Sequence, residues 1–401
     1  MNAEAHSEQN PRKHLLLPAL LLGIFLVYTF TVILSTNLVD IATSLKVSIG
    51  TASQFITVAK ILGLIIGIAM GFLTIRFKHK TLFLIGTAIY GLGALGSFFA
   101  PDFLTMLAFQ VFFGIGSAMV NITVFALIGE FVPLQKRGWA VGLTWSISFS
   151  AYVFVSPLSS FVSVAAGWRY MLLWFILPFS IICLVIGALV IPSKEQHKEQ
   201  PQTRPNYLQA FKQILSSRSA MACVVSTALA ALVATIPTYA VSFYRLFFNT
   251  APSTAALFSS LAAVGGIIGG AGAGTLINRR GRKFLTVVSA FISGIFGILI
   301  TFVPNVWISV AFWALCASIL GMTWAALYSL VLEQVPDFKG SMMSVNHIFR
   351  NMGLILGVAI GGAVLNLFFN NFQILMTIFG ASGIALGLII LLFATDPYKT
   401  K

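Results

Sequence analysis

The 401-residue chain has little charge and very few acidic residues. Asp, Glu, Lys and Arg make up 8% of the sequence, and Asp and Glu together number only 10. A water-soluble protein of this length exposes far more charge, so an ordinary soluble domain is excluded. The mean hydropathy is +0.96 and 58% of the residues are hydrophobic. We therefore expect the chain to lie in a membrane.

Cysteine is also scarce, and no residue cluster is typical of a metal site or a catalytic site. Cys183, Cys223 and Cys316 fall within apolar runs without C-x-x-C spacing, so we expect buried free thiols. We find no zinc-like grouping of His, Cys and Glu, and no paired Asp, H-x-x-x-H or Ser/His arrangement of an intramembrane enzyme. The sequence therefore predicts no metal, no cofactor and no enzymatic activity.

Apolar runs of the length that a helix needs to cross a bilayer, about 20 residues, recur along almost the whole chain. The first run is too long for a cleaved signal peptide, and no small-residue cleavage site follows it. The sequence therefore predicts an all-α membrane protein with twelve transmembrane helices. They cover residues 15–36, 51–74, 81–100, 103–129, 139–163, 169–191, 219–246, 253–277, 284–303, 306–332, 341–369 and 371–394.

Positive charge gathers in alternate connections between these runs. With both termini in the cytoplasm, all but five of the 24 Lys and Arg residues fall on the cytoplasmic side. Cytoplasmic loops of membrane proteins carry this excess of Lys and Arg. The basic stretch "NRRGRK" is then a cytoplasmic loop rather than a nucleic-acid patch, and we expect no nucleic-acid partner. The five others are Lys46, Arg169 and Arg245 outside, and Lys60 and Arg350 inside spans.

An internal repeat divides the chain into two similar halves. Several features recur at one offset of 203 residues, which indicates two six-helix bundles in tandem. They include Gly71–Lys80 with Gly274–Lys283, Pro101–Asp102 with Pro304–Asn305, and Glu130 with Glu333.

The expected organisation follows from this repeat. The bundles occupy residues 15–191 and 219–394. Residues 192–218 form a polar segment that we expect to be a flexible cytoplasmic linker. Residues 1–14 and 395–401 are expected to be cytoplasmic tails.

The basic loop after the second helix of each half resembles the pattern G-x-L-x-D-R-x-G-R-[RK] of the major facilitator superfamily. The second copy has Asn278 in place of the Asp, and the first has Ile75 there. The second copy matches at Gly274, Leu276, Arg279, Gly281, Arg282 and Lys283, and the first at Gly71, Leu73, Arg76 and Lys80.

The resemblance implies a secondary active transporter in a plasma membrane, the inner membrane of a prokaryote. Such a protein moves a small-molecule substrate by alternating access, with protons or a counter-transported solute as coupling partner. The lipid bilayer surrounds it.

The resemblance also implies a lock at the cytoplasmic face. Each half ends its fourth span with a glutamate that can approach the basic loop of its own half. We expect Glu130 near Arg76 and Arg137, and Glu333 near Arg279; the alternative is that these charges are simply solvated. The loop and gating candidates are Gly71, Arg76, Glu130, Arg137, Gly274, Arg279, Gly281, Arg282 and Glu333.

Small residues recur every four positions on the second, fifth, eighth and eleventh spans. Such spacing lets helix backbones approach closely in a membrane. The resemblance places these four spans between the halves, so we expect a sliding interface there; generic tight packing is the alternative. The ladders are Gly63, Gly67 and Gly71; Gly142, Ser146 and Ser150; Gly266, Gly270 and Gly274; and Gly353, Gly357 and Gly361.

Two cations lie within predicted spans, where a charge is costly and usually marks function. Lys60 and Arg350 each precede a glycine ladder by 3 residues, and His347 shares the Arg350 face. None of the carboxylates is predicted at the membrane centre, which favours an anionic or carboxylated substrate. The alternatives are that the cations bind polar neighbours, or that Lys60 is deprotonated and takes part in proton coupling.

The family lines its central cavity with residues of spans 1, 4, 7 and 10, which implies further candidate contacts. Each of them is also compatible with simple packing. They are Tyr28, Asn121, Tyr239, Trp324 and Tyr328.

The alternative function is a proton-coupled exporter of amphipathic drugs. Asp40, close after the first span, is the candidate for proton coupling, and an ordinary loop aspartate is the alternative. The fifth span, "VSPLSSF", lacks the glycines that accompany proline in that branch, and Gln110 stands where the branch often has Arg. Both departures favour the first reading.

Overall fold

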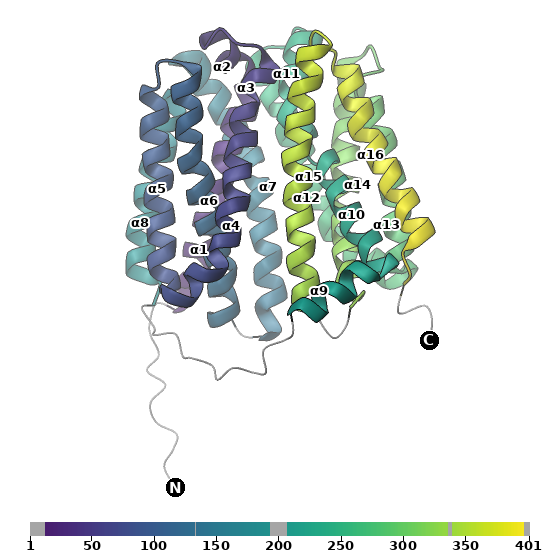
Figure 1. Cartoon of the computed structure of the whole chain (residues 1–401). Helices are drawn as coiled ribbons and strands as arrows, with labels where there is room; N and C mark the ends of the chain where they lie inside the picture. Colours follow the sequence, from purple (N-terminus) through teal and green to yellow (C-terminus); the bar gives the residue numbers. More distant parts are fainter. Residues whose placement is uncertain (1–12, 133, 193–206, 336–338, 397–401) are drawn as a thin grey trace.

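A computed structural model describes residues 13–132, 134–192, 207–335 and 339–396. Most of the two predicted tails and the first part of the predicted linker lie outside these residues. The described chain is helical, and Figure 1 shows its purple-to-blue helices beside its green-to-yellow helices. The element order therefore separates into an N-terminal half and a C-terminal half, as the repeat predicts.

The N-terminal half begins with α1 and ends with α8. A short π-helical turn, η1, precedes α8. The elements are α1 (Lys13–Thr36), α2 (Leu38–Ser44), α3 (Ile49–Ala52), α4 (Gln54–Arg76), α5 (His79–Phe99), α6 (Phe103–Phe131), α7 (Leu134–Ala165), η1 (Leu172–Ile176) and α8 (Leu177–Val190).

The C-terminal half follows after α9, which belongs to the segment between the halves. Its first span is divided into α10 and α11, with Pro237 in the first turn of α11. The elements are α9 (Tyr207–Ser216), α10 (Arg218–Val233), α11 (Ile236–Phe247), α12 (Pro252–Arg280), α13 (Arg282–Leu299), α14 (Val306–Leu332), α15 (Lys339–Leu367) and α16 (Phe372–Phe393).

Twelve helical segments of the described residues are long and apolar enough to cross a membrane. Their limits agree closely with the twelve predicted runs, which confirms the predicted fold class. The largest difference is in the fifth, predicted from residue 139, where the apolar segment begins at Ser146. We call the face where α1 begins and α16 ends the terminal face, at the bottom of Figure 1, and the other the opposite face.

Local contacts confirm the 203-residue repeat. Asp102 caps α6, since its Oδ1 accepts the backbone N–H of Thr105 at 2.8 Å. Asn305 caps α14 in the same way, its Oδ1 accepting the backbone N–H of Ile308 at 3.3 Å. The hydrogen bonds from Thr105 also hold the pKa of the Asp102 carboxyl below its usual value. Asp102 and Asn305 are 203 residues apart, and so are Thr105 and Ile308.

The four spans that carry the ladders meet between the halves, since α4 contacts α15 and α7 contacts α12. The ladder glycines themselves pack mainly against helices of their own half. A methyl group on Gly63 would lie 3.5 Å from the carbonyl oxygen of Gly114 in α6. Its counterpart on Gly266 would lie 3.6 Å from the carbonyl oxygen of Ala317 in α14, and 3.2 Å from the Phe149 ring of α7 in the other half. Bilayer lipid gives helices no hydrophobic reason to associate, so close backbone packing must hold each bundle together.

The third ladder behaves in the same way, while the weaker ladder is only partly described. Gly353, Gly357 and Gly361 of α15 face Ala228, Thr235 and Tyr239, all in the C-terminal half. The surroundings of Gly142 lie outside the described side chains.

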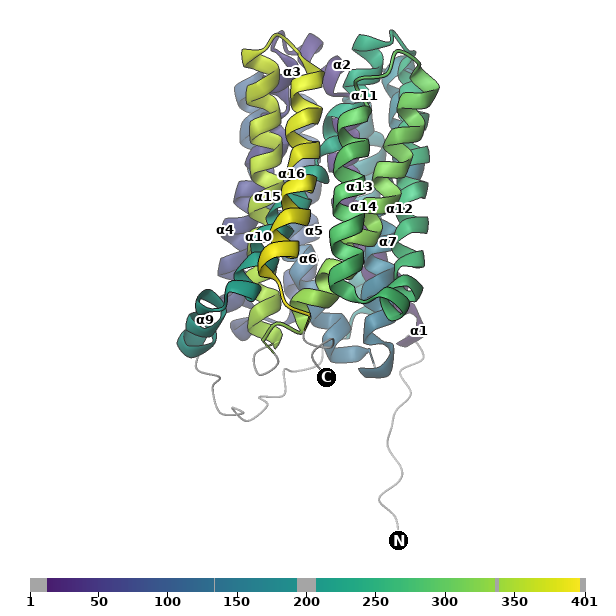
Figure 2. The same ribbon diagram turned by 90° about the vertical axis from the view of Figure 1, so that its right-hand side faces the viewer.

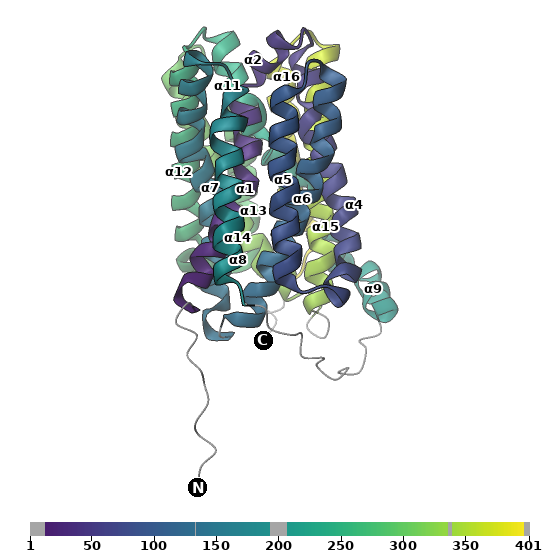
Figure 3. The ribbon, with the colours of Figure 1, turned by 90° about the vertical axis from the view of Figure 1, so that its left-hand side faces the viewer.

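The predicted flexible linker contains a helix that the composition did not reveal. α9 lies at the terminal face in both rotated views, Figures 2 and 3, and contacts α10 and α15. Ile214 on this helix is fully buried. Apolar residues at 207, 208, 211, 214 and 215 share one helical face, a pattern that the polar composition of the segment obscured.

Two neighbouring glycines test whether the small residues hold the bundle together. A methyl group on Gly269 would overlap the carbonyl oxygen of Ser318, whereas one on Gly270 would meet its nearest atom at 4.0 Å. We expect Gly269→Ala to destabilise the protein by about 1–3 kcal/mol, a typical cost of overpacking. Gly270→Ala should be neutral or slightly stabilising because alanine favours helix. Thermal unfolding of both variants in detergent measures this; equal melting temperatures would contradict the packing argument.

Candidate functional site

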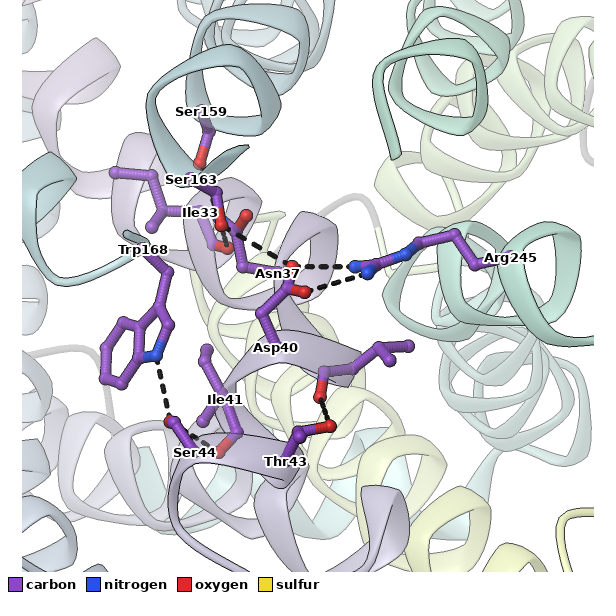
Figure 4. A network of polar contacts seen from close by, with 11 residues as sticks. Ile33, Asn37, Asp40, Ile41, Thr43, Ser44, Ser159, Ser163, Trp168 and Arg245 are labelled. Carbon is purple, nitrogen blue, oxygen red and sulfur yellow. Dashed lines mark hydrogen bonds and ion pairs between the residues drawn. The ribbon is translucent and has the colours of Figure 1, made fainter. Parts of the chain in front are cut away.

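The two halves are joined at the opposite face by an ion pair between α2 and α11. Arg245 donates two hydrogen bonds to Asp40, with Nη1–Oδ2 at 2.7 Å and Nη2–Oδ1 at 2.8 Å (Figure 4). Ser163 of α7 lies 3.5 Å from Asp40 Oδ2. Asp40, the sequence candidate for proton coupling, is thus part of a contact between the halves.

Hydrogen bonds close the same face around this pair. The Tyr239 hydroxyl lies 3.0 Å from Oγ of Ser53 and 2.6 Å from the carbonyl oxygen of Val358. Ser48 donates to the side-chain oxygen of Asn366 in α15. Tyr239 and Ser53 are fully buried, so the halves pack closely here.

The seam between α7 and α12 shows where the halves begin to separate. The Ser260 hydroxyl donates to the carbonyl oxygen of Val153 at 3.0 Å. Six residues further along α12 toward the terminal face, a methyl group on Gly266 would still meet the Phe149 ring at 3.2 Å. A methyl group on Gly274 would meet nothing within 4 Å. The contacts between the halves therefore lie toward the opposite face, and the seam opens toward the terminal face.

Three basic side chains gather between the halves. Arg350 of α15 lies close enough to Lys60 of α4 for its charge to act on it. It acts in the same way on His347, one turn earlier in α15. Lys60 and Arg350 are partly exposed and His347 is exposed. The two halves thus contribute to one positively charged region.

Aromatic side chains surround Arg350. Its guanidinium group lies close to the hydroxyl of Tyr28 on α1 and 5.9 Å from the ring centroid of Trp324 on α14. The Trp324 and Tyr328 rings are 5.7 Å apart, inclined at 49°. All three aromatic residues are partly exposed. We call Tyr28, Lys60, Trp324, Tyr328, His347 and Arg350 the central cluster.

Two other sequence candidates have different surroundings. Tyr239 belongs to the closed opposite face described above. The Asn121 side chain donates to the carbonyl oxygen of Ser117, one turn earlier in its own helix, at 3.0 Å. Sequence reasoning missed Tyr152 of α7, whose neighbour is Tyr28; it is one of several aromatic residues on that span, and nothing in the sequence distinguishes it.

Among the described residues, an ion pair is present at the terminal face of each half. His79 Nδ1 lies 3.3 Å from Glu130 Oε2, and Arg282 Nη1 lies 3.7 Å from Glu333 Oε1. His79 and Arg282 are 203 residues apart, as are Glu130 and Glu333, so the two ion pairs follow the repeat. Each basic partner stands in the first turn of the helix after the loop.

The basic partners differ from those expected. His79, rather than Arg76, pairs with Glu130, because Arg76 ends the preceding helix with its side chain exposed. Arg279 is likewise exposed. The Arg137 side chain lies outside those that the structure describes.

The glycines of the basic loops have different surroundings. Gly281 joins α12 to α13 with φ at +86°, a conformation that favours glycine. The equivalent position in the first half is Lys78, with φ at −62°, so that loop takes another path. Gly274 lies in open surroundings, and those of Gly71 are not among the described side chains.

The sequence resembles a known family along its whole described length. A sequence model of the Major Facilitator Superfamily matches residues 20–246 and 242–401. The chain is 23% identical over 384 residues to YbcL, an uncharacterised MFS-type transporter of Bacillus subtilis (strain 168), covering 93% of this chain and 94% of that protein. It is 28% identical over 151 residues to a D-xylose transporter of Levilactobacillus brevis, but that match covers 37% of this chain and only 32% of that protein.

Solved structures share the fold. The crystal structure of a D-xylose-proton symporter has a TM-score of 0.79, with 95% of this chain and 98% of that chain covered. A crystal structure of the nucleoside transporter NupG has a TM-score of 0.78, with 95% and 100% covered. The sequence identity is 16% in both cases, so these likenesses concern the fold alone.

The opening of the seam predicts which face gives access to the central cluster. In the His347→Cys variant, the new cysteine should react with a membrane-impermeant maleimide added at the terminal face. It should react about tenfold faster than the cysteine of the Ala255→Cys variant, because Ala255 is fully buried. The three native cysteines are buried and should react slowly. Labelling rates in vesicles of both orientations measure this. Reaction of the cysteine at position 347 only from the opposite face would contradict the assignment.

Proposed function

The chain belongs to the major facilitator superfamily, and we propose that it moves a small anionic solute, bound at the central cluster, by alternating access. Its relatives are transporters, and it is a multi-pass membrane protein of the same kind. The observation that carries the anionic preference is the meeting of Lys60 and Arg350, from different halves, in one region.

Electrostatics supports an anionic substrate. Two like charges held together in a partly buried region repel each other, and each loses part of its hydration. A carboxylate or phosphate placed between them offsets both costs and gains charge-assisted hydrogen bonds. The planar guanidinium of Arg350 can bind such a group through two nitrogens, while Lys60 supplies a point charge.

The placement of the acidic residues agrees with this argument. The described carboxylates lie at helix ends or in connections near the two faces. They are Asp40, Asp102, Glu130, Glu333 and Asp396. Among the described residues, the ion pairs of these carboxylates involve His79, Arg245 and Arg282 rather than Lys60. An anionic substrate would therefore supply negative charge beside Lys60.

A neutral sugar is the second candidate substrate. Trp324 and Tyr328 present partly exposed rings beside Arg350, and aromatic faces pack well against flat apolar surfaces. A curated relative and a structural neighbour are named for D-xylose. An amphipathic drug would also use these rings, with proton coupling, for which Asp40 stays a candidate.

The side of the membrane to which the terminal face belongs follows from the charge pattern. We propose that this face is cytoplasmic in a plasma membrane, because the exposed cations Arg76, Arg279 and Arg280 lie on it. The described conformation is then open to the cytoplasm and closed to the outside.

A C-terminal fusion tests this orientation. We expect green fluorescent protein fused after residue 401 to fluoresce in bacterial cells, because it folds in the cytoplasm. Alkaline phosphatase at the same position should be inactive, since it needs the oxidising periplasm for its disulfides. Active phosphatase without fluorescence would place the terminal face outside.

Substitution of the two cations tests the proposed substrate class. We expect Lys60→Gln and Arg350→Gln each to lower kcat/KM for anions by about tenfold or more, the effect of losing one charge-assisted hydrogen bond. Lys78→Gln, an exposed cation of the terminal face, is the control and should transport like the parent. Uptake into proteoliposomes is measured for mono- and dicarboxylates, phosphate esters, D-xylose, a nucleoside and a lipophilic cation. Uptake of anions by both variants at the parental rate would remove the anionic preference and favour the sugar or drug candidates.

A further inference from the structure

The ion pair between Asp40 and Arg245 differs from the other ion pairs of the described residues in what it connects. His79–Glu130 and Arg282–Glu333 each lie within one half. Asp40 belongs to the N-terminal half and Arg245 to the C-terminal half. This pair must therefore break whenever the halves separate at the opposite face, whereas the other two can persist.

Asp40 is held firmly in its own half. The Asn37 side chain donates to the Ser159 hydroxyl at 2.5 Å, and the Trp168 indole N–H donates to the Ser44 hydroxyl at 3.0 Å. These contacts tie both ends of α2 to the segment formed by α7 and the turn after it (Figure 4). Asp40 therefore moves with the N-terminal half.

Arg245 is held in the other half by its neighbour in α11. The Tyr244 hydroxyl lies 3.0 Å from the Ser309 hydroxyl of α14, and the Tyr244 ring stacks on Trp313 at 5.7 Å. Both Tyr244 and Trp313 are almost fully buried. The two charges thus report the relative position of two rigid bodies.

The pair is strong enough to matter for the balance between conformations. It has the two-nitrogen geometry that makes arginine–carboxylate contacts directional. The side chain of Arg245 is only 13% exposed and that of Asp40 30% exposed, so solvent screens their attraction only in part. Separation at the opposite face exposes both charges to water, and this rehydration replaces the lost contact only in part.

We propose that the Asp40–Arg245 pair is a latch that sets the ratio of the two access states, and thereby regulates access to the central cluster. While the latch is closed, the cluster is reached from the terminal face. When it breaks, the equilibrium moves toward the state that is open at the opposite face. This role rests on the proposed alternating-access function, but it does not depend on which solute is carried.

Spin-label distances test the latch without any substrate. One label pair at Thr43→Cys and Ser253→Cys reports the opposite face, and a second at Gly129→Cys and Thr275→Cys reports the terminal face. All four positions are exposed, Gly129 has nothing within 4 Å that a side chain would meet, and the native cysteines are buried. Each label pair spans the two halves, so electron–electron distance measurements resolve the two states as separate populations.

We expect Asp40→Asn and Arg245→Gln each to raise the population with long opposite-face distances relative to the parent by about tenfold, between the effects of an exposed and a buried ion pair. The terminal-face distances should shorten in the same variants. Arg169→Gln is the matched control: Arg169 is another cation near the opposite face, but it donates to Ala100 within its own half, so its loss should leave both distributions unchanged.

The exchanged double variant, Asp40→Arg with Arg245→Asp, should return the population toward the parental ratio. Parental distance distributions in both single variants would overturn the latch, as would an equal shift in Arg169→Gln. Because these distances are recorded without solute, a failed latch is distinguishable from a failed substrate assignment, which only the uptake panel reports.

Discussion

The structure depends on one constraint: each six-helix half must be rigid inside, while the seam between the halves must be breakable. Inside a half, glycines bring backbones into contact, as where Gly265 meets Ala314 and Gly269 meets Ser318. Such contacts are numerous, depend on shape, and leave no room to slide. Between the halves, hydrogen bonds and one ion pair of the described residues are concentrated toward one face, beside close contacts such as that of Gly50 with Gly362. Polar contacts suit a breakable seam because water can replace them when the halves part.

The repeat explains which features come in pairs and which do not. Helix caps and terminal-face ion pairs occur twice at the 203-residue offset, because both halves solve the same folding problem. The central cluster occurs once. The positions equivalent to Lys60 and Arg350 are Ala263 and Ile147, which carry no charge. A substrate need not be symmetric, so the residues that bind it can differ between the two halves. The residues that hold the helices together are similar in both halves because both have the same fold.

The sequence was sufficient for the fold because membrane helices have a strong and simple signal. Runs of apolar residues located all twelve spans, and the repeat located the division between the halves. The linker helix α9 was missed because the helix is only ten residues long and lies in a polar segment. Helix boundaries within the membrane follow from composition, whereas a short surface helix depends on the α10 and α15 surfaces against which it packs.

Side-chain partners were harder to predict, since they depend on small rotations of helices. Lys60 and Arg350 were identified from their cost in a membrane, and the structure brings them together. The spans with the glycine ladders do meet at the seam, but most ladder glycines pack inside their own half, because spacing identifies a close-packed helix face and not the helix that it faces. Glu130 meets His79 instead of Arg76 for a similar reason: three residues along the chain separate a side chain that reaches α6 from one that points to solvent.

The cations of the opposite face show how exceptions to a charge pattern carry information. The few arginines near the opposite face are exceptions to the charge pattern, and the contacts of two of them differ in what they connect. Arg245 binds Asp40 across the seam, and Arg169 binds the Ala100 carbonyl oxygen while lying 4.7 Å from the Trp168 ring centroid. Arg169 has its contacts within one half and therefore contributes to the stability of that half. Arg245 has its contact across the seam, and the same chemistry there acts on the equilibrium between conformations instead.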